Sequence, residues 1–120
     1  MEPRELFAIA RAAGLAVGEA ATPRPMIVRE AGLFGPTPGG QAWHVPDGVC
    51  GFAGIVVKGN TAFGRYAKKI GATHPNYGGG LYISVREYGQ SLERKEAFAN
   101  AFARELNAAG VRAYVNSRMD

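Results

Sequence analysis

The residues best placed for chemistry lie where a predicted strand meets a predicted helix, around Ser91. Gly89 and Gln90 precede this serine, and Arg94 and Lys95 lie on the first turn of the helix. The amides at a helix start, a hydroxyl group and two cations can together bind an anion such as phosphate. The alternative is an ordinary cap, in which Ser91 accepts hydrogen bonds from amides of its own helix. Basic side chains in a first turn oppose the helix dipole, so their position requires some other explanation.

A second set of candidate binding residues lies in the middle third of the sequence. Residues 48–86 contain no acidic residue, and the net charge of +4 arises from this segment. Within it, 17 consecutive residues hold five basic or potentially basic side chains: Lys58, Arg65, Lys68, Lys69 and His74. These side chains can contact phosphates, and the nearby Tyr77 and Tyr82 can stack on bases. The alternative is a solvated helix face that binds nothing.

Residues suited to catalysis or metal binding form no recognised pattern. His44 and Cys50 can in principle form a thiolate pair, but Cys50 lies in an apolar stretch, where a free cysteine usually packs as a small hydrophobe. His44, Asp47 and Cys50 do not have the spacing of a zinc site. The sequence therefore predicts no catalytic residue, no metal and no cofactor. Whether the chain is an enzyme stays open, and the residues favour a binding role.

Three consecutive glycines, residues 78–80, raise the question of a phosphate-binding loop. Such a loop follows a strand and begins a helix, so that the anion rests on the amides of the helix. These glycines instead precede a predicted strand, and no Gly-Lys-Ser or Gly-Lys-Thr occurs in the chain. We predict that they form a turn through which the chain enters a sheet.

The overall composition limits the class of protein. A chain of 120 residues with 47% hydrophobic and 20% charged residues fits one folded domain, residues 1–120. No run of residues approaches the roughly 20 apolar residues that span a bilayer, so no membrane contact is predicted. Cys50 is the only cysteine, which indicates a reducing, cytoplasmic compartment without disulfides. Oligomeric state is not predicted.

Three helices are predicted from apolar residues that recur with the helical period. The first begins near Pro3 and ends at Gly14, and its apolar face consists of Leu6, Ile9, Ala10 and Ala13. The second follows the N-cap Thr61 and stops at Gly71, and its apolar face consists of Phe63, Tyr66, Ala67 and Ile70. The third covers residues 91–109 and stops at Gly110.

The strands are predicted from short apolar or alternating runs. They are residues 26–28, two arms of a hairpin about the turn Pro46-Asp47-Gly48, residues 81–88 and residues 111–115. Residues 30–41 are rich in glycine and proline and are predicted to be an irregular loop. The fold class is α/β or α+β, with a small sheet of about four to five strands, two helices packed on it and an additional N-terminal helix.

Several short motifs in the second half of the chain resemble one family. They are Cys-Gly-Phe-Ala at residues 50–53, Lys-Lys at 68–69, Tyr-Gly-Gln-Ser at 88–91, Arg-Lys-Glu-Ala at 94–97 and the ending Ser-Arg-Met-Asp. With these motifs, residues 48–120 resemble small uncharacterised proteins encoded by tailed phages and prophages. Those proteins tend to have tryptophan where this chain has Gly54. The resemblance implies a bacterial host cell and mobile DNA as the context, and it implies no particular activity.

Three functions are compatible with these observations. The first is a binding protein that engages nucleic acid or another polyanion through Lys58, Arg65, Lys68, Lys69 and the junction of Gln90, Ser91, Arg94 and Lys95. The second is an inhibitor or modulator of a host enzyme or defence system, similar to an anti-CRISPR protein, with Phe34 and Trp43 as protein contacts. The third is a nucleotide-binding protein or enzyme that uses Ser91 and His74.

Overall fold

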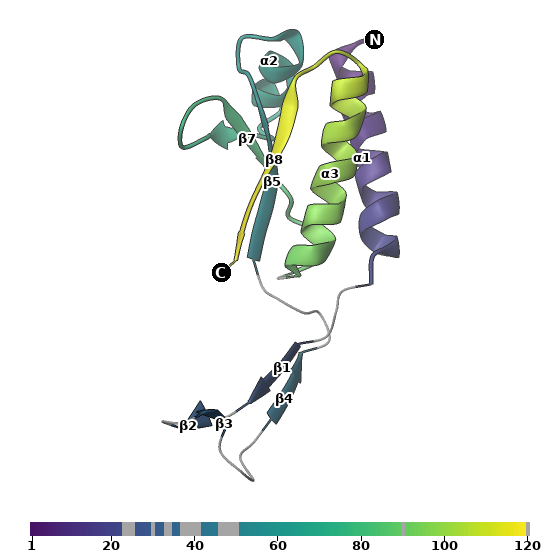
Figure 1. Cartoon of the computed structure of the whole chain (residues 1–120). Helices are drawn as coiled ribbons and strands as arrows, with labels where there is room; N and C mark the ends of the chain where they lie inside the picture. The colour runs from purple at the N-terminus through teal and green to yellow at the C-terminus, as the bar shows by residue number, and fades with distance from the viewer. Residues whose placement is uncertain are drawn as a thin grey trace.

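A four-stranded antiparallel sheet forms the centre of the molecule (Figure 1). The computed structural model describes residues 1–22, 26–29, 31–32, 35–36, 42–45, 51–89 and 91–119. The strands of the sheet are β5 (Gly51–Val57), β6 (His74–Pro75), β7 (Leu81–Ser84) and β8 (Ala113–Met119), and their order is β6-β7-β5-β8. Helix α2 (Ala62–Lys69) follows β5, and α3 (Leu92–Ala108) follows β7. The chain from β5 onward therefore has the β-α-β-β-α-β order of a split βαβ fold.

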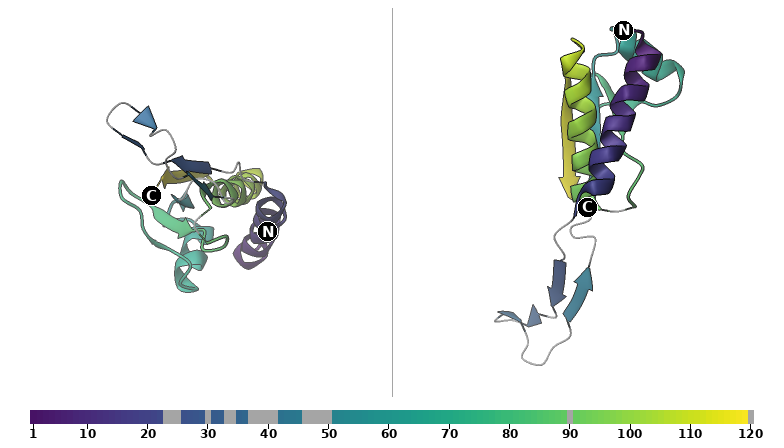
Figure 2. Two further views of the ribbon diagram at one scale, coloured as in Figure 1. Left: turned by 90° about the horizontal axis from the view of Figure 1, so that it is seen from below. Right: turned by 90° about the vertical axis from the view of Figure 1, so that its right-hand side faces the viewer.

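The helices gather on one side of this sheet. The N-terminal helix α1 (Pro3–Ala20) and α3 lie side by side along the sheet, and the views in Figures 1 and 2 both show this arrangement. The arrangement confirms the predicted α+β fold with an additional N-terminal helix. Among the helices of the described part of the chain, none is long and apolar enough to cross a membrane.

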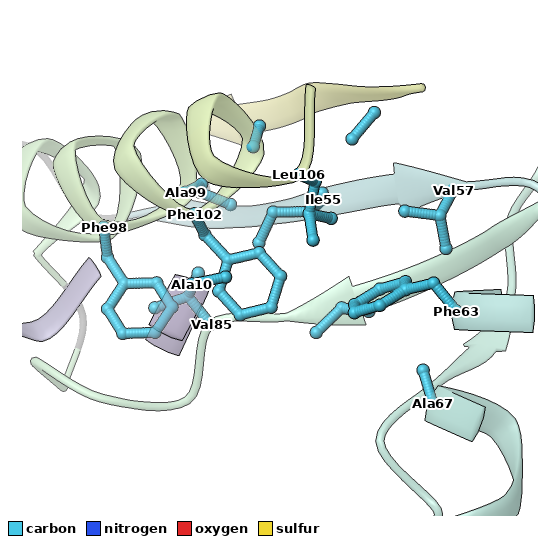
Figure 3. Close-up of a cluster of buried hydrophobic side chains, with 14 of the residues drawn as sticks. Ala10, Ile55, Val57, Phe63, Ala67, Val85, Phe98, Ala99, Phe102 and Leu106 are labelled. Atoms are coloured by element: carbon cyan, nitrogen blue, oxygen red, sulfur yellow. The ribbon is translucent and has the colours of Figure 1, made fainter. Parts of the chain in front are cut away.

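The core lies between the helices and the covered face of the sheet (Figure 3). Alternate residues of β5 point to this face, so that Ala53, Ile55 and Val57 are each 2% exposed or less. Phe102 and Leu106 of α3 meet them from the helix side. Burial of these aliphatic and aromatic groups drives the helices onto the sheet.

Small residues allow α1 and α3 to approach each other closely. Ala10, Gly14 and Gly18 are buried on one stripe of α1. A Cβ on Gly14 would lie 2.9 Å from the Phe98 ring, and one on Gly18 would lie 2.6 Å from the Tyr88 hydroxyl. The prediction that Gly14 ends the first helix is wrong, because this glycine serves close packing within a helix that continues to Ala20. Ile9 was predicted on the buried face but is 43% exposed, because the contact between α1 and α3 runs along the small residues instead.

The second helix largely follows the prediction. The Thr61 hydroxyl accepts a hydrogen bond from the Gly64 amide at 3.0 Å, which confirms the predicted cap. Phe63 is buried, and Gly71 takes a left-handed φ of 76° just after the helix, as a stop residue does. Ile70 is 47% exposed, contrary to the prediction, because it lies beyond the last helical turn at the C-cap.

The predicted hairpin, whose two arms flank the turn Pro46-Asp47-Gly48 within residues 42–59, is wrong. Strand β4 (Ala42–Val45) pairs instead with β1 (Met26–Arg29), which confirms a strand at the predicted residues 26–28. Both edges of β5 are occupied, by β7 on one side and β8 on the other, so it has no edge left for β4. The predicted turn at Pro46 to Gly48 lies outside the described residues. A short ladder of β2 (Ala31–Gly32) and β3 (Gly35–Pro36) lies within the segment predicted as a loop.

The last helix and strand are shifted slightly from their predicted bounds. Gly110 has a φ of 87° and ends the helical segment as predicted. The Asn107 amide nitrogen donates to the carbonyl oxygens of Ala103 and Ala113, and its oxygen accepts from the Ala113 amide. These hydrogen bonds fix where β8 begins. The strand then continues to Met119, well beyond the predicted end at Val115, because it pairs with the whole length of β5.

Strand β7 is shorter than predicted. It ends at Ser84, although the Val85 amide still donates to the Ala53 carbonyl at 3.0 Å. Tyr88 and Gly89 have φ values of 69° and 55°, which turn the chain away from the sheet and toward α3. The Tyr88 hydroxyl donates to the Leu15 carbonyl at 3.4 Å, so this turn is tied to α1.

Candidate functional site

The face of the sheet opposite the helices carries a concave site. Alternate strand residues face this uncovered side of the sheet: Phe52, Gly54 and Val56 of β5, Tyr82 and Ser84 of β7, and Tyr114, Asn116 and Arg118 of β8. A pocket of about 340 Å³ lies there, and its lining includes Phe52, His74, Tyr82, Asn116 and Arg118. Aromatic, amide and guanidinium groups therefore share one surface.

Two rings form a platform at one side of this pocket. His74 pairs with Tyr82 across β6 and β7, and their rings stack with centroids 5.7 Å apart and planes 25° apart. The Tyr82 ring also lies over Gly54, because a Cβ on this glycine would be 2.3 Å from the ring carbon Cζ. Burial raises the pKa of Tyr82 above its usual value, and the positive charge of Arg118 partly opposes the rise. The Tyr82 phenol of this platform is therefore protonated and uncharged at neutral pH.

A third ring lies at the start of β5. Phe52 is 37% exposed, and the Arg118 guanidinium carbon lies 5.2 Å from its ring centroid. The Lys95 ammonium nitrogen lies 5.4 Å from the same centroid. Cations at such distances from an aromatic ring are attracted to it, so Phe52 helps to position Arg118 at the edge of the pocket.

A second pocket, of about 320 Å³, lies toward the other end of the same strands. Its lining includes Val56, Lys58, Arg112, Tyr114 and the glycines 78–80. Tyr114 is 56% exposed, and Lys58 and Arg112 are exposed. This pocket therefore joins a ring and two cations at the end of the sheet opposite to Arg118.

The electrostatic character of the uncovered face follows from its sequence. None of the strands β5, β6, β7 and β8 contains an aspartate or glutamate. Lys58, Arg112 and Arg118 supply positive charge at the two ends. A surface with cations and no carboxylate in its strands attracts anions.

The glycines at residues 78–80 form a tight turn between β6 and β7. All three have positive φ values, of 100°, 109° and 84°. The Asn76 amide donates to the Gly80 carbonyl at 3.0 Å, and the Gly79 amide donates to the Asn76 carbonyl at 3.1 Å. The structure thus confirms the predicted turn. Tyr77 lies in this turn and is fully exposed.

The predicted basic residues of the middle segment lie around α2. Lys68 and Lys69 are exposed on the last turn of this helix, whose buried Phe63 faces the core. One Arg65 guanidinium nitrogen donates to the Asn60 carbonyl at 2.9 Å, which holds the loop before the helix. Of this predicted set, Lys58 and His74 line the pockets of the uncovered face. The other three lie on α2, which packs against the helix side of the sheet.

The junction around Ser91 is largely buried. Ser91 is 1% exposed and is the N-cap of α3, but its side chain forms no capping hydrogen bond with the helix amides. Lys95 is 5% exposed, and its ammonium group donates to the Gly51 carbonyl at 3.3 Å. Arg94 is half-buried, and its Nε atom has no hydrogen-bond partner. Gln90 lies outside the described residues, and an anion site at this junction stays a prediction.

The two predicted basic groups lie at opposite ends of the sheet. The Ser91 junction is near the start of β5, where Lys95 contacts Gly51, and α2 lies beyond its other end (Figure 1). Seven residues of strand separate them by about 20 Å. They therefore do not form one cluster.

The other predicted candidates fall on less informative positions. Trp43 and His44 lie on β4 and pair with Val28 and Ile27. Phe34, Asp47 and Cys50 lie outside the described residues. Within the described ranges, no group of three or more histidine, cysteine, aspartate or glutamate residues could hold a metal ion.

The sequence interpretation missed several residues of the uncovered face: Phe52, Arg112, Tyr114, Asn116 and Arg118. The alternation of Tyr114, Asn116 and Arg118 indicates that they share one face of a strand. The predicted strand ended at Val115 and so left out two of these three residues. Comparison with protein-family models, with curated proteins and with solved structures gives no match.

Proposed function

We propose that the protein is a non-enzymatic nucleic-acid-binding protein and that the uncovered face of the sheet is its binding surface. One observation carries the proposal. Exposed rings and the cations Lys58, Arg112 and Arg118 share a face whose strands contain no carboxylate. Phosphates can contact the cations while the polar and aromatic groups between them face the nucleotides.

The number of cations sets the expected strength and salt dependence of binding. Each phosphate contact releases counterions and contributes about 0.7 to 0.9 to the slope of log affinity against log salt. Three contacts on this face therefore give a slope of about −2 to −3. The exposed lysines of α2 add charge nearby without belonging to this face.

A salt titration with charge-matched variants tests the proposal. Fluorescence anisotropy of a labelled oligonucleotide is measured against protein concentration at several salt concentrations. The double variant Lys58→Gln/Arg118→Gln should bind more weakly and reduce the slope by about 1 to 2. The control Arg4→Gln/Arg104→Gln removes the same charge from exposed positions on α1 and α3 and should keep the wild-type slope.

Two results would contradict the proposal. One is wild-type protein that fails to bind at low salt, or binds with no salt dependence. The other is an equal loss of affinity in both double variants, which would indicate attraction by net charge rather than by one face.

A further inference from the structure

We infer that the nucleic acid bound is single-stranded and that one of its bases stacks on the ring pair of His74 and Tyr82. The inference rests on the proposed function, and it specifies the substrate class and the contact. It is argued from the spacing of the rings, from the polar side chains of Asn116 and Ser84 between the strands, and from the positive charge of Arg118.

The rings of this face are too far apart for stacked, paired bases. The Tyr82 ring lies over Gly54, which is two residues from Phe52 along β5. Side chains two residues apart on one face of a strand are separated by about 7 Å. Consecutive bases of a duplex are only about 3.4 Å apart and hide their faces from a protein. A single strand can splay its bases so that separate rings contact separate bases.

The absence of a side chain at Gly54 makes this platform possible. Any Cβ there would collide with the Tyr82 ring and with the Ile83 carbonyl oxygen, at 2.3 and 2.6 Å. The ring therefore lies low on the sheet beside the exposed His74, and the pocket opens next to both rings. A planar group that enters the pocket meets a ring pair already in a stacked arrangement.

Polar groups beside the platform suit the edge of a base and its phosphate. Asn116 and Ser84 lie on either side of Gly54 in the register of the sheet, and both line the pocket. An exposed amide can both donate and accept hydrogen bonds with a base edge. Arg118 lies at the far side of the pocket, where it can contact the phosphate that follows the stacked base.

Three probes separate the inference from the proposed function. Wild-type protein is titrated with a labelled single-stranded oligonucleotide, with the same oligonucleotide annealed to its complement, and with inorganic polyphosphate as a competitor without bases. We expect the single strand to bind at least about tenfold more tightly than the duplex, since stacking adds to the phosphate contacts. Polyphosphate should compete only at high concentration.

Variants of the ring pair test the contact itself. Tyr82→Ala should weaken single-strand binding about 5- to 100-fold and weaken duplex binding less, while Tyr82→Phe keeps the ring and stays within about twofold of wild type. Tyr66→Ala removes a tyrosine from α2 on the helix side and serves as the control. His74→Ala is a second test that does not risk the fold, because His74 is exposed; it should lower single-strand affinity several-fold.

The outcomes are distinguishable. If no probe binds, or if polyphosphate competes as well as the single strand, both the proposed function and the inference are overturned. Salt-dependent binding of duplex and single strand with equal affinity, unchanged by Tyr82→Ala and His74→Ala, would leave the proposed function standing and overturn the inference.

Discussion

The two faces of the four-stranded sheet are built from the same strands, but one face packs against helices and the other lines two pockets. On the covered face, Ala53 and Ile55 of β5 are 1% and 0% exposed beneath α3. On the uncovered face of the same strand, Phe52 is 37% exposed, and its ring lies beneath the cationic groups of Arg118 and of Lys95 at the start of α3. The alternation of a strand thus lets one strand contribute both to the core and to the proposed binding surface, because neighbouring residues point to opposite faces. Substitution of a side chain that touches only one face should therefore leave the property of the other face intact, and Gly54, whose Cβ would also meet the backbone of β7, is the exception.

The largest effect on stability is expected from Phe102→Ala. Phe102 is 1% exposed, and its ring packs edge-on against Phe7 at 5.5 Å and stacks with Phe98 at 6.0 Å. Its truncation leaves a cavity in the covered core and should lower the free energy of unfolding by about 3 to 5 kcal/mol. Denaturant unfolding measures this loss. Nucleic-acid affinity at a temperature where the variant is folded should not change, and a loss below about 1 kcal/mol would contradict the described core.

An intermediate effect that involves both properties is expected from Gly54→Ala. The new methyl group collides with the Tyr82 ring and the backbone of β7, so the variant should lose about 1 to 3 kcal/mol of unfolding free energy and bind single strands more weakly. Gly59→Ala is the matched control, since its Cβ would meet Leu81 at an ordinary 3.5 Å. Thermal melts and anisotropy compare the two. Equal tolerance of both substitutions would show that Tyr82 does not lie over Gly54.

The smallest effect concerns the ionisation of Tyr82. Burial raises its pKa above the unfolded value of 10.0, so folding favours the protonated phenol. Its contribution to stability is fully present below about pH 10 and is lost as the pH rises through the higher folded pKa. Above about pH 10, the unfolding free energy of the wild type should therefore fall relative to that of Tyr82→Phe. Denaturation at paired pH values measures this difference, and a difference independent of pH would contradict the partial burial of the Tyr82 phenol.

Local patterns in the sequence predicted several helix ends and one turn. The Thr61 cap, the Gly71 and Gly110 stops and the glycine turn at 78–80 depend only on neighbouring residues, and each is found in the structure. Gly14 was misread because close helix packing and helix termination both favour glycine. Which of the two applies depends on Phe98, which is distant in the sequence.

The uncovered face was less predictable for a physical reason. Tyr77 and Tyr82 were predicted as stacking residues and His74 as a basic group from their types alone, but their neighbours come from strand pairing. Phe52, Asn116 and Arg118 meet Tyr82 only because β5 lies between β7 and β8, and no local pattern encodes that order. At the Ser91 junction, the local sequence predicted that Ser91 lies at the N-cap of the helix. It did not predict that Ser91 is buried, because burial depends on distant residues.

Mapping the amides perturbed by a bound single strand tests the central claim most directly. Spectra of isotope-labelled protein are recorded during titration with an unlabelled single-stranded oligonucleotide. We predict that the shifts concentrate at residues 52–56, 82–84 and 114–118 and spare α1 and the outer turns of α3. Shifts confined to α2 and its lysines, or an unchanged spectrum at saturating oligonucleotide, would contradict a binding surface on the uncovered face.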